Sequence, residues 1–336
     1  MNSRNLIKKN ALLFAPMEGI TDQAYRMAMQ ELYPEWDLFY TDFLRIPSEG
    51  LYTKSKILEH LGSEVFNSKR QNDKTIFQIL ASESSHIIES VTSIKDLGID
   101  KLDLNLGCPS KKVNSHKGGA YLLSDHAALK KILLSIRDTF SGFFSVKIRI
   151  GYRDDLLFTE TLKLIEDCGV EAITLHARTR DQLYLGRADW KYIKQAVKTV
   201  NIPLIGNGDI WTVEDIENCF HETGCHAVMC ARGALKTPWM AGLYKENVGR
   251  IHMINQEMLN RTRAEQIDLY FHFLEKHYRK NGYREEVILK RFKGLCQFIF
   301  EDFFGAESIR SLFLRSRELS EFKANLESLQ RASVYA

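Results

Sequence analysis

The segment Leu102-Asp103-Leu104-Asn105-Leu106-Gly107-Cys108-Pro109-Ser110 combines a strand pattern with a tight turn. Its leucines recur at every second position, and this period of two predicts a buried β-strand. The Gly-Cys-Pro sequence that follows is typical of a turn, so the strand ends before it. We therefore expect Cys108 to lie at the carboxyl end of a strand, which is where a parallel barrel places its reactive groups.

Seven other short apolar or β-branched runs alternate with segments that have the spacing of amphipathic helices. The eight predicted strands lie near residues 12–15, 38–41, 75–80, 101–106, 145–150, 172–176, 203–206 and 227–231. Eight strand–helix units with parallel strands predict a (β/α)8 TIM barrel. An open doubly wound sheet is the alternative, but it usually has a glycine fingerprint after its first strand, and Ala15-Pro16-Met17-Glu18-Gly19 has none.

The pattern changes after about residue 244. No strand-like run follows, and the stretches Ala264–Tyr278, Glu285–Phe300 and Ser308–Leu319 place apolar residues at helical spacing. We therefore predict an α/β chain in which a TIM barrel, residues 1–245, precedes a small C-terminal all-helical domain, residues 246–336. No low-complexity linker separates the two, so we expect them to pack together.

Composition and charge narrow the class of protein. No apolar segment is long enough to cross a bilayer, and residues 1–10 lack the apolar core of an export signal. The six cysteines are scattered through a chain too large to need disulfides, which fits reduced thiols and predicts a cytoplasmic protein. The formal net charge is only +3, but residues 250–336 hold 15 Lys and Arg against 12 Asp and Glu, so the excess lies in the helical part.

Cys108 could be core filler, a metal ligand, a nucleophile or a proton donor, and free cysteine is most often buried filler. Turn residues flank it here, and residues 111–117 contain three lysines and a histidine. Nearby positive charge lowers the pKa of a thiol or attracts an anionic ligand. This neighbourhood favours a reactive role. The paired glycines at 118 and 119 predict a mobile loop over residues 109–119 that closes over a substrate.

Polar residues recur at the predicted carboxyl ends of nearly all eight strands, and such ends meet at one mouth of a barrel. They are Glu18, Asp42, Arg45, Gln78, Asn105, Cys108, Lys147, Arg149, His176, Arg178, Asn207, Asp209 and Arg232. Structural alternatives exist, because Lys147 could pair with Asp103 and His176 could be a hydrogen-bonded core residue. Their joint position favours a binding site.

The last two strand ends form the region where barrels of this class bind phosphate groups. Gly206, Gly208 and Gly233 would permit close approach of a ligand to the backbone, and Arg232 could supply a charged contact. A lysine deep in the barrel, such as Lys147, can stabilise negative charge on a reduced flavin. The amide side chains at the other strand ends offer paired donors and acceptors. A phosphorylated flavin fits this set.

A metal site is a further alternative, because Cys219, His221, Cys225 and His226 lie close together in the sequence. Their spacing matches no common zinc pattern. Gly224 occupies the place of a helix C-cap, and Cys219 occupies an apolar helix position. We therefore expect no metal.

At this point the chain strongly resembles the tRNA-dihydrouridine synthases, flavin enzymes that reduce particular uridines in tRNA. The matching segments are residues 15–22, 104–110, 117–120, 146–149, 176–179, 206–209 and 231–234. The Asn-x-Gly-Cys-Pro segment together with Ala-Pro-Met is highly specific, whereas His-x-Arg-Thr and Asn-Gly-Asp alone would be weak.

The resemblance implies a cofactor, FMN, at the barrel mouth and NADPH or NADH as its reductant. It assigns cofactor binding to Pro16, Met17, Gln78, Lys147, His176, Asn207, Gly208, Asp209, Ala231 and Arg232. One departure is Ala231, where relatives often carry glycine. Alanine is compatible with a contact through the backbone N–H if the backbone angle suits it.

Within the family, Glu18, Arg45 and the long interval between Arg45 and Gln78 are most similar to the bacterial C-type branch, which modifies uridine 16 in the D-loop. This resemblance implies tRNA as the partner, and we expect a monomer. It assigns substrate contacts to Arg45, Asn105, Arg178, Tyr184, Arg291 and Lys293. The basic residues of the helical part, interleaved with aromatic ones, would contact phosphates and bases, and a solvated helix face is the alternative.

The resemblance also implies a mechanism. Hydride would pass from reduced FMN to C6 of a flipped-out uracil, Cys108 would donate a proton to C5, and Asn105 would hold the edge of the base. The alternatives are another FMN-dependent TIM-barrel oxidoreductase that acts on a small molecule, such as a dihydroorotate dehydrogenase, and a non-catalytic tRNA-binding protein.

Overall fold

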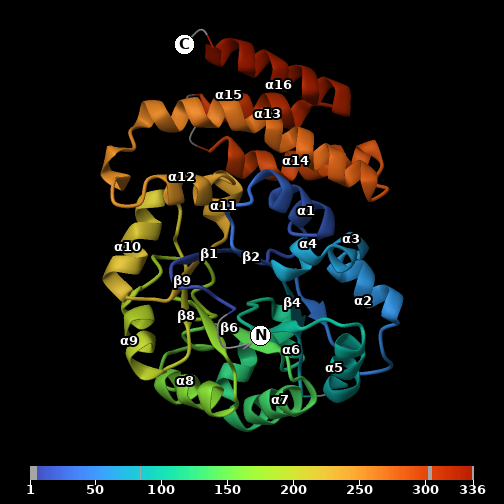
Figure 1. Cartoon of the computed structure of the whole chain (residues 1–336), viewed down its shortest axis with the longest axis vertical. Coiled ribbons are helices and arrows are strands. Elements are labelled where there is room, and N and C mark those ends of the chain that lie inside the picture. The colour runs from blue at the N-terminus through green and yellow to red at the C-terminus, as the bar shows by residue number, and fades with distance from the viewer. Residues whose placement is uncertain (1–5, 84, 302–304, 335–336) are drawn as a thin grey trace.

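Eight parallel strands close into a barrel, seen in the lower half of Figure 1. In the computed structural model, which describes residues 6–83, 85–301 and 305–334, they are β1 (Ala11–Phe14), β2 (Leu38–Tyr40), β4 (Thr75–Leu80), β5 (Lys101–Leu106), β6 (Phe143–Arg149), β7 (Ala172–His176), β8 (Leu204–Asn207) and β9 (Ala227–Cys230). Successive barrel strands pair in parallel, including β2 with β4, and β9 pairs back with β1. The predicted TIM barrel is confirmed.

The strand bounds follow the sequence prediction closely. Strands β4, β5 and β7 have the predicted bounds, and the other five shift by one or two residues. An additional strand, β3 (Leu44–Arg45), pairs with the carboxyl end of β4 and places Arg45 opposite Leu80. Two residues carry no periodicity, so the sequence could not predict it.

Helices surround the barrel and connect its strands. They are α1 (Gln23–Leu32), α2 (Lys54–Leu61), α3 (Ser63–Asn67), α4 (Lys69–Asp73), α5 (Ile87–Asp96), α6 (Lys111–Ser115), α7 (His126–Thr139), α8 (Phe158–Asp167), α9 (Lys191–Thr199), α10 (Val213–Thr223), α11 (Arg232–Lys236) and α12 (Met240–Glu246), with 3-10 turns η2 (Gly119–Ser124) and η3 (Ile251–Met253). Local sequence sets several of their ends. Thr212 and Asp215 form a capping box at the start of α10, and Gly224 ends that helix in the left-handed conformation, as predicted.

Alternation along β5 divides its side chains between two environments. Leu102, Leu104 and Leu106 are fully buried in the core between the barrel and its helices. Asp103 and Asn105 have the opposite parity and point into the barrel. The same parity on the other strands brings their polar residues to the barrel interior, so the period of two that predicted the strand also positions the site.

Four more helices follow the barrel: α13 (Gln256–Lys280), α14 (Glu285–Ile299), α15 (Ala306–Arg315) and α16 (Leu319–Val334). Figure 1 shows them, in orange and red, stacked beyond α1, α11 and α12. The helix predicted over residues 308–319 is two elements, because the chain leaves helical geometry at Ser316, whose buried hydroxyl accepts a hydrogen bond from Asn325. Phe271, Phe313 and Phe322 pack face and edge in the core of this layer.

Helix α1 joins the barrel to the C-terminal helices. The hydroxyl groups of Tyr25 on α1 and Tyr270 on α13 are 3.1 Å apart in a buried contact. Glu31 at the other end of α1 binds the buried His277 of α13 at 2.7 Å. These contacts pack the helices directly on the barrel, as expected. No helix in the described part of the chain is long and apolar enough to cross a membrane.

Candidate active site

A cavity of about 430 Å³ opens at the carboxyl ends of the barrel strands. All ten predicted cofactor-binding residues line it, together with Cys108, Asn105 and Tyr184. Segments far apart in the sequence meet here, because each barrel strand delivers its last inward-facing side chain to the same mouth. The structure therefore brings these residues together at one mouth of the barrel, as the sequence predicted.

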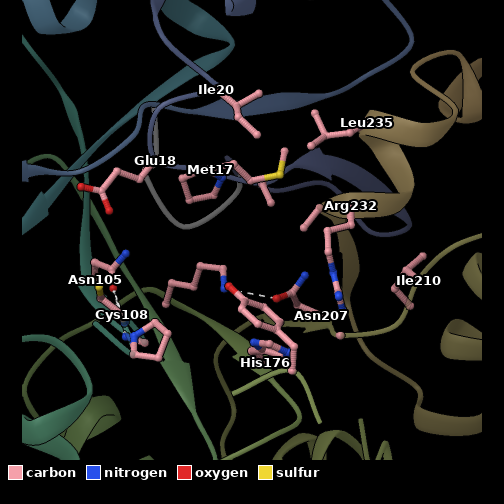
Figure 2. A pocket seen from close by; sticks show the side chains of 18 of the residues that line it. Met17, Glu18, Ile20, Asn105, Cys108, His176, Asn207, Ile210, Arg232 and Leu235 are labelled. Carbon is pink, nitrogen blue, oxygen red and sulfur yellow. Dashed lines mark hydrogen bonds between the residues drawn. The ribbon is translucent and has the colours of Figure 1, made fainter. Parts of the chain in front are cut away.

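The cavity has two chemically different ends. Figure 2 shows Glu18, Asn105 and Cys108 at one end and Arg232 and Ile210 at the other. His176 and Asn207 lie between them on one wall, and Met17, Ile20 and Leu235 form an apolar wall opposite. A flat, elongated ligand with a reactive part at the thiol and an anionic part at the arginine matches this arrangement.

Cys108 is held by its surroundings rather than carried on an irregular loop. Its backbone N–H donates to Oδ1 of Asn105 at 2.9 Å, and its carbonyl accepts from Nδ2 of Asn114 at 3.1 Å. The segment after it forms α6 and then η2, whereas the sequence predicted a loop over residues 109–119. A Cβ on Gly119 would come within 2.9 Å of Val113, and its φ is +59°, so glycine is required there for packing.

The ionisation of Cys108 differs from the sequence expectation. Burial raises the pKa of its thiol and Glu18 raises it further, while Arg45 and Arg149 oppose this shift. The lysines at 111, 112 and 117 are exposed to solvent and do not surround the sulfur. The prediction that local positive charge lowers the pKa was therefore wrong, because the side chain points inward. A protonated thiol is suited to donate a proton rather than to attack as a thiolate.

Lys147 places an ammonium group deep in the cavity. Its Nζ donates to Oδ1 of Asn207 at 3.2 Å, the contact drawn as a dashed line in Figure 2. Burial lowers its pKa to about 8, with Arg149 contributing, so it is mostly charged at neutral pH. The alternative of an ion pair with Asp103 does not occur, and within the described residues Lys147 forms no other ion pair. This cation faces the cavity, which fits a ligand that carries acceptors or negative charge.

His176 is a neutral group at the centre of the site. Burial lowers its pKa well below the usual value, and the surrounding cations Lys147, Arg149, Arg178 and Arg232 lower it further. Nη1 of Arg178 lies 3.4 Å from Nε2 of the imidazole. Because a guanidinium can only donate, Nε2 is the acceptor and Nδ1 carries the proton. His176 can therefore hydrogen-bond a ligand without adding charge.

Asp209 organises the arginines at the other end of the cavity. Its carboxylate accepts hydrogen bonds from Arg178 at 2.7 and 3.0 Å and from the backbone N–H of Ala188 at 2.7 Å, and Arg232 lies 3.4 Å away. Despite partial burial, these partners hold the pKa of Asp209 below its usual value. The guanidinium of Arg232 also lies 4.6 Å from the ring centre of Trp211. Arg232 is thus fixed in place and only partly neutralised.

The glycines near the arginine end also pack closely against the protein. A Cβ on Gly206 would lie 2.8 Å from the sulfur of Cys219, and one on Gly233 would lie 2.1 Å from the carbonyl oxygen of Ile210. Both positions therefore require glycine for packing, and Gly233 also lines the cavity. Gly208 is likewise enclosed, by Ala188 and His176, although it lines the cavity.

Four predicted substrate contacts lie outside the cavity: Arg45, Arg178, Arg291 and Lys293. Arg178 is 1% exposed and its guanidinium is held by Asp209 and by the carbonyl of Gly186. Its guanidinium is therefore engaged by protein groups in this structure. The sequence placed it correctly after β7 but could not show which way it points.

Arg291, Lys293 and Arg45 do not line the cavity. Arg291 on α14 binds Asp22 at 2.7 Å and the carbonyl of Gly19 at 3.3 Å, so it ties α14 to the loop after β1. Lys293 is half-buried on the same helix, and Arg45 is half-buried on β3. Neither of these two side chains is paired with a carboxylate in the described part of the chain.

Sequence reasoning missed the aromatic and apolar residues of the cavity. Trp211 and Ile210 follow the Asn-Gly-Asp turn, so their position after β8 could have indicated them. Phe298 comes from α14, and nothing in its helical spacing predicts that it reaches the barrel mouth. Arg149, which the sequence placed among the polar strand-end residues, has the inward parity of Lys147 and lines the cavity.

The four clustered thiol and imidazole groups do not form a metal site. The sulfurs of Cys219 and Cys225 are 4.0 Å apart in the core behind β8, and His226 binds the carbonyl oxygen of Ile7. No group of three or more His, Cys, Asp or Glu side chains in the described part of the chain could hold a metal ion.

Comparison with known proteins identifies the family. The family model described as dihydrouridine synthase (Dus) matches residues 13–333. The chain belongs to the dihydrouridine synthase family. This confirms the resemblance that the motifs around Cys108 indicated.

Several proteins that are similar to this chain share the name tRNA-dihydrouridine(16) synthase. The protein from Cupriavidus necator is 32% identical over 234 residues, which is 68% of this chain and 72% of the relative. The protein from Haemophilus influenzae is 33% identical over 245 residues, or 71% of this chain and 78% of the relative. The protein from Escherichia coli strain K12 is 32% identical over 245 residues, or 71% and 77%.

Among solved structures, histamine dehydrogenase from Rhizobium superposes with a TM-score of 0.52 at 12% identity. The match covers 80% of this chain and 51% of that chain. At this identity the likeness supports the barrel fold of the dihydrouridine synthase and carries no functional argument.

Proposed function

We propose that this chain reduces uridine 16 in the D-loop of tRNA to 5,6-dihydrouridine, with FMN as its cofactor and NADPH or NADH as reductant. The relatives named tRNA-dihydrouridine(16) synthase support the position. One observation supports the chemistry most directly: a single cavity holds a buried, protonated thiol at one end and a partly exposed lysine without a carboxylate partner in its middle.

The donor set of the cavity fits a phosphorylated flavin. Lys147 would bind the polar edge of the ring, and Gln78 and His176 would hydrogen-bond its heteroatoms. Pro16 and Met17 would pack on the ring from the apolar wall. Bound FMN supplies the hydride for the reduction of the base.

The arginine end of the cavity fits the phosphate. Arg232 would bind it, and Asn207, Gly208 and Ala231 would surround the chain that leads to it. Ala231 has φ −112°, so the alanine that replaces the usual glycine is not in the left-handed conformation that would favour glycine. Asp209 would act through Arg232, because a carboxylate facing a phosphate would repel it.

At the thiol end, this chain's residues would position the base and supply a proton. The uridine must leave its stack to enter the cavity. Asn105 would hydrogen-bond the uracil edge, and the thiol of Cys108 would give its proton to C5 while hydride adds to C6. A raised thiol pKa keeps that proton in place at neutral pH.

We also propose that the chain divides into a catalytic domain, residues 1–245, and a tRNA-binding domain, residues 246–336. The half-buried Lys293 and Arg45 and the exposed Tyr184 would contact the tRNA. Arg178 and Arg291 are assigned to positioning, since both are held by carboxylates.

The test is incubation of the flavin-loaded protein with NADPH and tRNA that lacks dihydrouridine, followed by mapping of the reduced uridines. We expect a visible flavin spectrum and dihydrouridine at position 16. A colourless protein that FMN cannot reconstitute would contradict the cofactor assignment. Reduction at another position would contradict the branch, and reduction of orotate-type small molecules but not of tRNA would favour the alternative oxidoreductase.

A further inference from the structure

Asp103 carries a buried carboxylate directly beneath the cavity. It points into the barrel from β5, is 0% exposed and does not line the cavity. Its Oδ2 accepts a hydrogen bond from Nε2 of Gln78 at 2.7 Å, and its Oδ1 accepts one from Oγ of Ser145 at 2.6 Å. Burying a carboxylate costs free energy. We therefore expect Asp103 to have a role in positioning the residues that it hydrogen-bonds.

Gln78 links Asp103 to Asn105 through the two ends of its side-chain amide. With its Nε2 on Asp103, its Oε1 accepts a hydrogen bond from Nδ2 of Asn105 at 2.9 Å. Inverting the Gln78 amide would place its oxygen against a carboxylate oxygen and its nitrogen against the Asn105 nitrogen. Both contacts would be repulsive, so the carboxylate fixes the orientation of the amide.

Asn105 connects the chain of contacts to Cys108. Its Oδ1 accepts the backbone N–H groups of Gly107 at 3.1 Å and of Cys108 at 2.9 Å. Both lone-pair directions of that oxygen are therefore used. The group that Asn105 still has for a ligand is the second N–H of its amide, so it offers a donor and not an acceptor.

We propose that Asp103 is a positioning residue that acts on Cys108 through Gln78 and Asn105, and that it thereby makes Asn105 a hydrogen-bond donor to a uracil carbonyl. The inference rests on the proposed function, because it names how this site recognises the base and holds the thiol. Uracil carbonyls accept hydrogen bonds, whereas the exocyclic amino group of cytosine in the same place would meet a second donor. The relay thus favours uridine over cytidine.

The charge state of Asp103 controls the relay. Burial raises the pKa of its carboxyl to about 6, while the hydrogen bonds from Ser145 and Gln78 and the charge of Lys147 on β6 oppose this shift. Tyr40 on β2 also interacts with it electrostatically. Below this pH the carboxyl gains a proton and becomes a donor itself, so its hold on Gln78 weakens.

Three variants separate the relay from a general structural role. Asp103→Leu removes the acceptor for Gln78. Asp103→Asn keeps an acceptor of the same shape but cannot ionise. Ser145→Ala is the matched control, because it removes the other hydrogen bond to the same carboxylate and leaves the relay intact.

The measurement is the rate at which reduced, flavin-loaded protein is reoxidised by tRNA, between roughly pH 5 and pH 9. We expect Asp103→Leu to slow this step by about 100-fold, the order of effect of a small misplacement of reacting groups. Ser145→Ala should stay near the wild type. Asp103→Asn should keep the rate at high pH and lose the acid limb that the wild type shows near pH 6. An unchanged rate in Asp103→Leu, or the same acid limb in Asp103→Asn, would overturn the proposal.

A second readout does not depend on turnover. Alkylation of Cys108 in the flavin-free protein, followed by mass spectrometry, reports the placement of the thiol. We expect Asp103→Leu to change its rate and Ser145→Ala to leave it unchanged, and equal rates in all proteins would overturn the proposal. If the wild type never reduces tRNA, the proposed function fails and this second readout still decides the relay. If Asp103→Leu does not fold, the pH profile of Asp103→Asn decides it.

Discussion

Cys108 shows how a single residue's chemistry depends on which way it points. Its sequence neighbours are cationic, but its sulfur lies among Leu80, Val113 and Phe43, so burial dominates and its pKa rises. A group in this state gives up its proton only to a base or to a developing carbanion.

We expect Cys108→Ala to lower the rate of tRNA reduction by about 10²- to 10⁴-fold, the usual contribution of a general acid. FMN content and flavin reduction by NADPH should remain, because the thiol lies at the end of the cavity away from Arg232. Single-turnover kinetics separate the two steps. In the wild type the tRNA step should hold through neutral pH and decline only at alkaline pH, since the raised pKa preserves the thiol. A wild-type tRNA rate in the alanine variant would rule out proton donation by Cys108.

Lys147 is the residue whose charge should tune the flavin. A cation beside the ring favours the negatively charged reduced form, so Lys147→Met should lower the midpoint potential by roughly 30 mV or more, about 1.4 kcal/mol for a two-electron couple. Its pKa of about 8 means that the charge fades above that pH. The difference between variant and wild type, measured by spectroelectrochemistry, should therefore shrink above about pH 8. An equal potential at pH 7 would show that Lys147 does not contact the ring.

At the scale of elements, the sequence predicted the barrel well because each strand has an independent period-two signal. It also predicted which strand ends carry the site, since parity and position along the strand are both visible in the sequence. It could not predict which way the side chain of Arg178 points, that burial raises the pKa of Cys108, or that Phe298 reaches the barrel mouth. Each of these depends on contacts between segments far apart in the chain.

Helix α14 offers a test of whether its cations bind tRNA or hold the fold. Arg291 is tied to Asp22 and Gly19, whereas Lys293 makes no hydrogen bond or ion pair with the described residues. Each phosphate contact changes the slope of log affinity against log salt by about 0.7 to 0.9.

We therefore expect Lys293→Ala to weaken tRNA binding and reduce the salt slope by about one unit or slightly less. Arg291→Met should leave the slope unchanged and lower the free energy of unfolding by about 1 kcal/mol or less, because its ion pair is only partly buried. Filter binding over a salt series and thermal unfolding give the two readouts. A reduced salt slope in Arg291→Met together with an unchanged slope in Lys293→Ala would mean that Arg291 binds tRNA and Lys293 does not.

At the scale of the whole molecule, the barrel and the C-terminal helices form one continuous apolar core. Residues from β1 to α16 belong to the same buried cluster, and the cavity itself includes Phe298 from α14. The site is therefore complete only when both parts are folded together, and conditions that loosen their interface should also affect the cavity. Glu31, at the contact of α1 with α13, is the carboxylate through which acid acts on that interface.

The acid stability of the protein should show two opposing effects. Lys276 and His277 hold the pKa of Glu31 below its usual value, so the stability that Glu31 contributes is present at neutral pH and is lost as the pH falls below about 4. The pKa of Asp103 is raised to about 6, so the folded state gains a proton first and is stabilised as the pH falls from about 6 to 4.

Chemical unfolding of the flavin-free protein should therefore show no loss of stability from pH 7 to 5 and a decline below about pH 4. Asp103→Asn should abolish the gain between pH 6 and 4, and Glu31→Gln should flatten the decline by about 1 kcal/mol or less. A steady loss of stability from pH 7 downward, unchanged in Asp103→Asn, would mean that the buried carboxyl is ionised throughout.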